Sequence, residues 1–148
     1  LARRAIQGGM LDGYDLGPPL TERVDTFVGI AGANRGLTAC YFTPHIPTCS
    51  DQNGFYPGYA FFWGMTGLSD FLRELNAKSG LEGANVYSIW SRADQLIGYG
   101  GLVYGKYTSR IPGQDGEKVY DSYPYGHFCV RDLSARVQLE MVRDHRVP

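Results

Sequence analysis

The sequence predicts an α/β fold in which a mostly parallel sheet is flanked by helices. The first observation is a dense apolar run at residues 85–94, NVYSIWSRAD, whose β-branched and aromatic side chains indicate a strand buried on both faces. The second is the alternation of strand-like runs with segments of helical periodicity along the chain. A length of 148 residues suffices for one domain with a core, so we expect a single domain over residues 1–148.

Composition and charge exclude several classes of protein. With 43% hydrophobic and 20% charged residues, the chain is ordinary for a folded protein, which argues against wholesale disorder. The formal net charge of −1 and the scattered basic residues give no electrostatic footprint for nucleic acid. No apolar run approaches the roughly 18 residues of a transmembrane helix. We therefore expect no nucleic-acid partner and no membrane-spanning segment.

The first half of the chain is predicted to contain a helix, a strand and a long irregular segment. Residues 1–7 resemble the last turns of a helix, which two glycines end. Residues 10–19 are rich in Gly and Pro and indicate a loop. Residues 24–30, VDTFVGI, predict a second strand that ends in a Gly/Asn turn. Residues 36–67 read as irregular, and a segment of that kind in a compact domain is usually either functional or wrongly interpreted.

The second half surrounds the run at 85–94. Before it, Ser69 or Asp70 can cap a short helix through Asn76, with Phe71, Leu72 and Leu75 buried. After it, residues 96–108 are irregular and residues 118–122 predict a short strand.

A final helix is predicted over residues 132–145. Leu133, Val137 and Met141 would form its apolar ridge, with four exposed charged residues: Arg136, Glu140, Arg143 and Asp144. Because only about three strands are visible, we expect a sheet that is open along one side.

Two residues stand where open α/β sheets place their ligands, at the carboxyl edge of the strands. Asp94 directly follows the predicted central strand, and His127 lies 33 positions later in the motif YPYGH. In a Ser-His-Asp triad the acid orients the imidazole, and the imidazole removes the proton from the nucleophile. We predict that Asp94 and His127 are the acid and base of such a triad, within hydrogen-bond reach of each other. An Asp after a strand is also a common turn residue, and the sequence contains no G-x-S-x-G nucleophile motif.

Other residues offer weaker alternatives. His45, between prolines, and His145, at a helix end, are further candidate bases. Cys40, His45 and Cys49 have some character of a metal site, but no fourth ligand lies at suitable spacing. Residues 100–106 approach a phosphate-binding loop, although Tyr107 stands where Ser or Thr is needed. An aromatic cluster either covers the sheet or lines an apolar substrate pocket: Phe55, Tyr56, Tyr59, Phe61, Phe62 and Trp63.

The three cysteines bear on the compartment in which the protein works. Cys40 and Cys49 are nine positions apart around a rigid Pro-containing segment, and a disulfide between them would suit a secreted protein. The alternative is two free thiols in a reducing compartment. Cys129 is then the odd cysteine, which is either buried or paired with a group outside this chain.

Several motifs in the same order resemble the class 2 lipases, especially secreted nematode members. They are VDTFVGIAGANRGL (24–37), VYSIWSRADQLI (86–97), YTSRIPGQDGEKVY (107–120) and YPYGHF (123–128). More distantly, the chain is similar to small bacterial triacylglycerol lipases, which are minimal α/β-hydrolases. The resemblance implies that Asp94 is the triad acid and His127 the triad base.

The resemblance also implies that this chain is the C-terminal part of an α/β-hydrolase. The first residues, LARRAI, resemble the helix that follows the nucleophile elbow, so the serine and the oxyanion-hole donors are expected upstream of Leu1. We therefore expect a secreted lipase or carboxylic-ester hydrolase that acts on lipid esters without a cofactor or metal, and a 148-residue chain that is inactive by itself. The alternative is a non-catalytic α/β module that binds a lipid or a protein partner.

Overall fold

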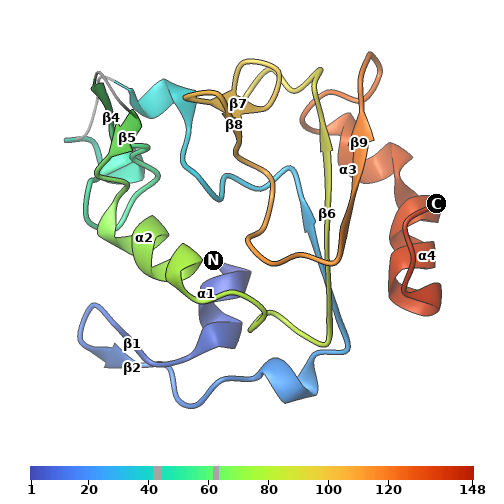
Figure 1. Cartoon of the computed structure of the whole chain (residues 1–148), viewed down its shortest axis with the longest axis horizontal. Helices are drawn as coiled ribbons and strands as arrows, with labels where there is room; N and C mark the ends of the chain where they lie inside the picture. The colour runs from blue at the N-terminus through green and yellow to red at the C-terminus, as the bar shows by residue number, and fades with distance from the viewer. Residues whose placement is uncertain (42–44, 62–63) are drawn as a thin grey trace.

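A three-stranded parallel sheet forms the centre of the computed structural model, which describes residues 1–41, 45–61 and 64–148. The strands stand side by side in the order β3-β6-β9 (Figure 1). Their bounds are Thr26–Ile30 for β3, Asn85–Ser91 for β6 and Gly116–Tyr120 for β9. The predicted α/β class and the parallel pairing are confirmed.

The central strand is buried as its sequence predicts. In β6 every residue from Val86 to Ser91 is buried. The strand pairs with both neighbours, so that Val86 lies opposite Phe27 of β3 and Tyr87 lies opposite Gly116 of β9. In the described part of the chain β3 has no strand on its other side, which leaves that edge of the sheet open.

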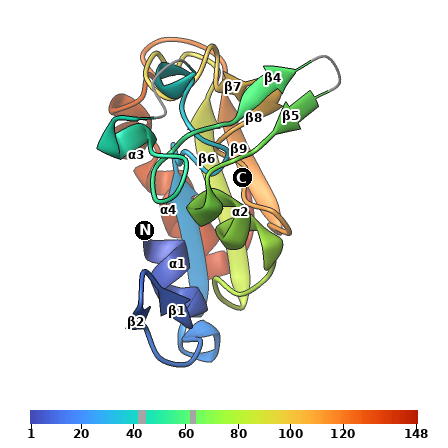
Figure 2. The same ribbon diagram turned by 90° about the vertical axis from the view of Figure 1, so that its left-hand side faces the viewer.

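Helices lie on the two faces of this sheet (Figures 1 and 2). On one face are α1 (Ala2–Gln7) and α2 (Asp70–Ala77). On the other are α3 (Cys129–Leu133) and α4 (Ala135–Asp144), which pack against the sheet through a core that includes Tyr87, Ile89, Val130 and Met141. A smaller apolar cluster lies under α2: Phe71, Leu72 and Leu75 with Leu11, Phe55 and Leu68.

The start of α2 follows from its sequence. Ser69 is the N-cap, and its Oγ accepts a hydrogen bond from the Leu72 N–H at 3.2 Å. This bond satisfies one of the backbone donors that a helix start leaves free. The predicted cap and buried face are confirmed, and the helix ends at Ala77, one residue later than predicted.

The prediction of a single C-terminal helix over residues 132–145 is wrong in two respects. The helical segment begins at Cys129 and is broken at Ser134, where α3 ends and α4 begins. The break turns the two helices relative to each other, so Leu133 is half exposed while Met141 is buried. Glu140 is buried rather than exposed, and its carboxylate accepts hydrogen bonds from Arg136 at 3.1 Å and from Arg146 at 2.9 Å.

The segments predicted as loops contain short antiparallel hairpins. These are β1 (Met10–Leu11) with β2 (Tyr14–Asp15), β4 (Tyr59–Phe61) with β5 (Gly64–Thr66), and β7 (Leu102–Val103) with β8 (Lys106–Tyr107). Three 3-10 turns accompany them: Thr21–Arg23, Thr38–Cys40 and Pro47–Cys49. Elements of two or three residues are too short to show a periodic pattern, which is why the sequence did not predict them. The strand expected at 118–122 is β9, which begins two residues earlier.

A disulfide joins Cys40 and Cys49, with their Cα atoms 5.1 Å apart. The predicted bond is therefore confirmed, and the alternative of two free thiols is wrong. Cys129 is exposed, so the prediction that it is buried is wrong. The other possibility, a bond with a group outside this chain, stays a prediction. No helix in the described residues is long and apolar enough to cross a membrane.

Candidate active site

Asp94 lies in the turn that directly follows β6, and the turn holds its carboxylate in one orientation. Its Oδ1 accepts two backbone hydrogen bonds, from Leu96 N–H at 2.8 Å and from Ile97 N–H at 3.1 Å. The turn is closed by Ser91, whose backbone carbonyl accepts from the Asp94 N–H at 3.2 Å and whose Oγ accepts from Ala93 at 3.0 Å. With Oδ1 occupied by backbone donors, Oδ2 is left to bond with another side chain.

His127 supplies that bond from the loop between β9 and α3. Its Nδ1 lies 2.8 Å from Asp94 Oδ2, which is within the hydrogen-bond range expected for this pair. The Asp94 side chain is buried, while 19% of the His127 side chain is exposed. In the neutral ring a proton on Nδ1 leaves Nε2 as an acceptor, and no hydrogen bond to Nε2 occurs within the described residues. In that tautomer Nε2 can accept a proton.

Aromatic stacking and a side-chain amide hold the His127 loop. The ring of Tyr125 stacks on Tyr120, the last residue of β9, with centroids 3.8 Å apart and planes 12° from parallel. Burial raises the pKa of Tyr120, and the neighbouring Tyr125 adds to that shift. The His127 backbone N–H donates to Gln95 Oε1 at 3.1 Å. The sequence alone did not indicate these roles of Tyr120, Tyr125 and Gln95. Gln95 directly follows Asp94, and Tyr125 lies inside the YPYGH motif, so their positions beside the predicted pair were the available signal.

His127 borders a groove at the carboxyl end of β3. The groove measures about 450 Å³ and is lined mainly by apolar residues: Val28, Ile30, Ala31, His127, Phe128 and Arg131. Ala31 directly follows the strand and has a φ of 48°, a left-handed conformation that a non-glycine residue seldom adopts. Its N–H donates to Ile89 O at 2.9 Å. His127 therefore lies beside the carboxyl end of β3, the strand whose outer edge is open in the described residues.

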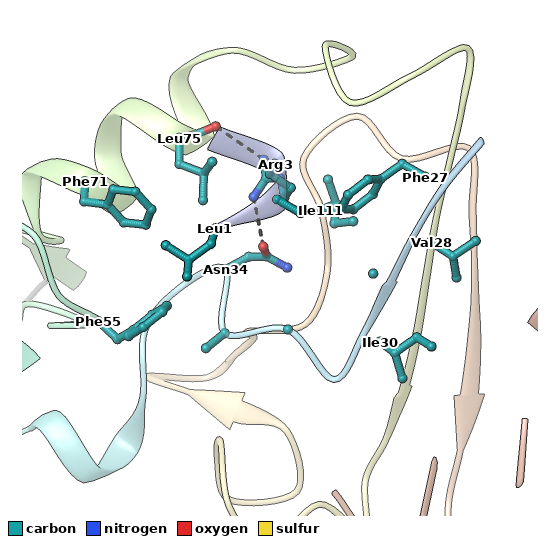
Figure 3. Close-up of a pocket in the computed structure, with 14 residues that line it drawn as sticks. Leu1, Arg3, Phe27, Val28, Ile30, Asn34, Phe55, Phe71, Leu75 and Ile111 are labelled. Atoms are coloured by element: carbon teal, nitrogen blue, oxygen red, sulfur yellow. Dashed lines mark hydrogen bonds between the residues drawn. The ribbon is translucent and has the colours of Figure 1, made fainter. Parts of the chain in front are cut away.

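A second pocket, of about 390 Å³, lies along the same strand (Figure 3). Its walls are mostly apolar, with side chains from Leu1, Phe27, Phe55, Phe71, Leu75 and Ile111. Arg3 and Asn34 supply its polar part and are hydrogen bonded to each other at 2.9 Å. The pocket next to Leu1 and the groove next to His127 therefore both border β3, the strand at the open edge of the sheet.

The other candidate bases lie elsewhere. The ring of His145 bonds through Nε2 to Asp25 Oδ2 at 2.9 Å, next to the amino end of β3 and away from the carboxyl end where Asp94 lies. His45 is exposed in the loop that the disulfide closes. Neither residue is joined to Asp94.

The metal and phosphate alternatives are not supported by the structure. The sulfurs of Cys40 and Cys49 are bonded to each other, and the described residues contain no group of three or more His, Cys, Asp or Glu placed to hold a metal ion. Residues 100–106 run into the β7–β8 hairpin and not into the helix that a phosphate-binding loop requires. Of the aromatic cluster, Tyr56 is buried and Phe55 lines the pocket of Figure 3, whereas Phe62 and Trp63 lie outside the described residues.

A carboxylate–imidazole pair at the carboxyl edge of a parallel sheet is typical of α/β enzymes that use histidine as a general base. The family model described as Lipase (class 2) matches residues 1–140. The chain belongs to the class 2 lipase family, which confirms the resemblance of its motifs and indicates lipase activity in the broad sense. A comparison with curated proteins found no match, and a comparison with solved structures found none.

Proposed function

We propose that this chain is the C-terminal part of an α/β-hydrolase that cleaves lipid esters by acyl transfer through a serine. The observation that carries the proposal is the hydrogen bond of 2.8 Å between His127 Nδ1 and Asp94 Oδ2, at the carboxyl edge of the sheet. Membership of the class 2 lipase family makes a lipid ester the expected substrate.

The proposed mechanism gives each member of the pair one task. The serine hydroxyl attacks the ester carbonyl while His127 Nε2 takes its proton, and the imidazolium then protonates the departing alcohol. Water then attacks the acyl-serine while His127 Nε2 takes its proton, and the imidazolium returns that proton to the serine oxygen as the fatty acid leaves. Asp94 accepts the Nδ1–H bond throughout, which fixes the ring and stabilises its charged form. The two backbone bonds to Asp94 Oδ1 keep the carboxylate from rotating away.

The nucleophile is proposed to lie upstream of Leu1. The sequence has no G-x-S-x-G motif, and within the described residues no serine hydroxyl bonds to His127. Ser88 and Ser91 are unsuited to attack, because both are buried in β6 and the Ser91 Oγ accepts a hydrogen bond from the Ala93 N–H. The open edge of β3 and the groove beside His127 support an approach of the missing elbow from this side.

Secretion is part of the proposal. The Cys40–Cys49 disulfide supports it, since structural disulfides persist in oxidising compartments. The chemistry requires no cofactor and no metal, because the proton transfers and the covalent intermediate are carried by protein side chains.

A serine-directed phosphonate ester tests the proposal. The full-length protein is labelled with the phosphonate, and peptide mass spectrometry locates the modified serine. We expect the label on a serine upstream of Leu1, and at least about 10³-fold slower labelling in a His127→Ala variant. A label within residues 1–148 would contradict the proposed position of the nucleophile. Complete absence of labelling would favour the alternative, a non-catalytic α/β module, which the missing elbow motif leaves as the second candidate.

A further inference from the structure

We infer that Gln95 is a positioning residue for His127, which extends the two-residue assignment of Asp94 and His127. The inference rests on the proposed function. Gln95 would act on catalysis only through His127, by fixing the backbone from which the imidazole extends.

Adjacent residues of one turn hold the two ends of His127. Asp94 Oδ2 bonds the ring at Nδ1, and Gln95 Oε1 accepts from the backbone N–H of His127 at 3.1 Å. The turn itself is stiff, since Asp94 Oδ1 accepts from the N–H groups of Leu96 and Ile97. When both the backbone and the ring of a residue are anchored to one rigid turn, few side-chain rotamers remain open to it. The position of Nε2 is then set by the turn that follows β6.

Gly126 makes room for this contact. A Cβ at position 126 would lie 2.9 Å from Gln95 Oε1, closer than real Cβ contacts allow. The φ of Gly126 lies outside the left-handed region, so its backbone conformation does not require glycine. A side chain at position 126 would therefore displace the Gln95 amide from its contact with His127.

The geometry of a general base governs its efficiency. A base must lie within hydrogen-bond reach of the proton it takes, and a misplacement of about 1 Å can cost as much as a hundredfold in rate. Gln95 is exposed, and the stack of Tyr125 on Tyr120 supports the loop independently. We therefore expect loss of the Gln95 bond to lower the rate without unfolding the loop.

The test compares two substitutions of Gln95 in the full-length protein. Gln95→Met keeps the length of the side chain but removes the acceptor, and Gln95→Glu keeps an acceptor oxygen. We expect Gln95→Met to lower kcat about tenfold while KM changes less than about twofold, and Gln95→Glu to restore most of kcat. Gln52→Met is the matched control, because Gln52 is also exposed but lies beside α2, and it should leave kcat unchanged.

Nuclear magnetic resonance of the His127 ring gives a readout that does not depend on turnover. In the wild type the ring nitrogen shifts should place the proton on Nδ1, in slow exchange with water. In Gln95→Met we expect a mixture of tautomers and faster exchange of that proton. A loss of general stability would not produce this change in a folded sample.

Gly126→Ala tests the same contact from the other side. The added methyl should displace the flexible Gln95 amide, so its effect on kcat should match that of Gln95→Met. The double variant should be no worse than either single variant, because both remove one interaction. If Gln95→Met does not fold, the kcat of Gly126→Ala alone decides whether Gln95 positions His127.

The outcomes separate this inference from the proposed function. An unchanged kcat and an unchanged Nδ1 proton signal in Gln95→Met, with turnover abolished by His127→Ala, would overturn the role of Gln95 and leave the proposed function standing. Full turnover in His127→Ala would contradict the proposed function. The Nδ1 proton signal would still decide whether Gln95 positions the ring.

Discussion

Arg3 and Glu82 are 79 positions apart in the sequence and form an ion pair whose side chains are both buried, with Arg3 Nε 2.8 Å from Glu82 Oε1. The guanidinium also donates to Asn34 Oδ1 at 2.9 Å and to Asn76 Oδ1 at 3.0 Å. Burial lowers the pKa of Arg3, and the bond to Glu82 opposes that shift. Arg3 thus joins α1 to α2 and to the loop that follows β3.

We predict that Arg3→Met destabilises the fold by about 3–5 kcal/mol, because it leaves Glu82 buried without its cation. Urea unfolding of the full-length protein measures the loss. Arg73→Met is the matched control, since Arg73 pairs with Asp70 on the surface of α2, and it should cost less than about 1 kcal/mol. Equal effects of the two substitutions would contradict the importance of the buried pair.

The disulfide between Cys40 and Cys49 closes a short loop, with a sequence separation of nine residues. We predict that replacing both cysteines by serine lowers the unfolding free energy by about 2–3 kcal/mol, chiefly because the unfolded chain gains freedom. Urea unfolding with and without reductant measures this difference. If reductant lowers the stability of the double-serine variant as much as that of the wild type, the effect does not come from this bond.

The parts of the molecule that could be predicted from the sequence are those with a local signal. The strand β6 was evident because its buried residues are contiguous, and Asp94 was found because it ends that run. The break at Ser134 and the burial of Glu140 could not be predicted, because they depend on how α3 and α4 pack against the sheet and not on a local sequence signal. The contact of Gln95 with His127 could not be predicted either, because the two residues lie in different loops.

Glu117 gives a prediction about pH. Arg110 holds the pKa of Glu117 below its ordinary value, and the Trp90 N–H adds to this, while burial opposes both. Since the pKa is lower in the folded than in the unfolded state, the ionised carboxylate stabilises the fold above the unfolded value of about 4.3. This contribution is lost as the pH falls through the folded pKa.

The stability difference between the wild type and Glu117→Gln should therefore be largest near neutral pH and shrink below about pH 4.3. Urea unfolding at a series of pH values measures it. Arg110→Met should remove the same pH-dependent contribution to the free energy of unfolding. A difference that does not change with pH would show that the carboxylate charge has no role in stability.

A protein consisting of residues 1–148 alone should not hydrolyse a short-chain ester faster than its His127→Ala variant. The residual acceleration of about 10³–10⁴ that serine hydrolases keep without a triad member depends on an intact oxyanion hole, which is proposed to lie upstream. Release of a coloured alcohol from the ester measures turnover. Activity that Asp94→Ala abolishes would place a nucleophile inside these residues.

His127, oriented by Asp94, is the proposed general base of ester hydrolysis. The most direct test is kcat/KM of the full-length protein for a short-chain ester, with His127→Ala compared against His45→Ala, an exposed histidine in the disulfide loop. We predict that His127→Ala lowers kcat/KM by about 10³-fold or more and that His45→Ala leaves it within about twofold of the wild type. A His127→Ala variant that keeps the activity of the wild type would contradict this role of His127.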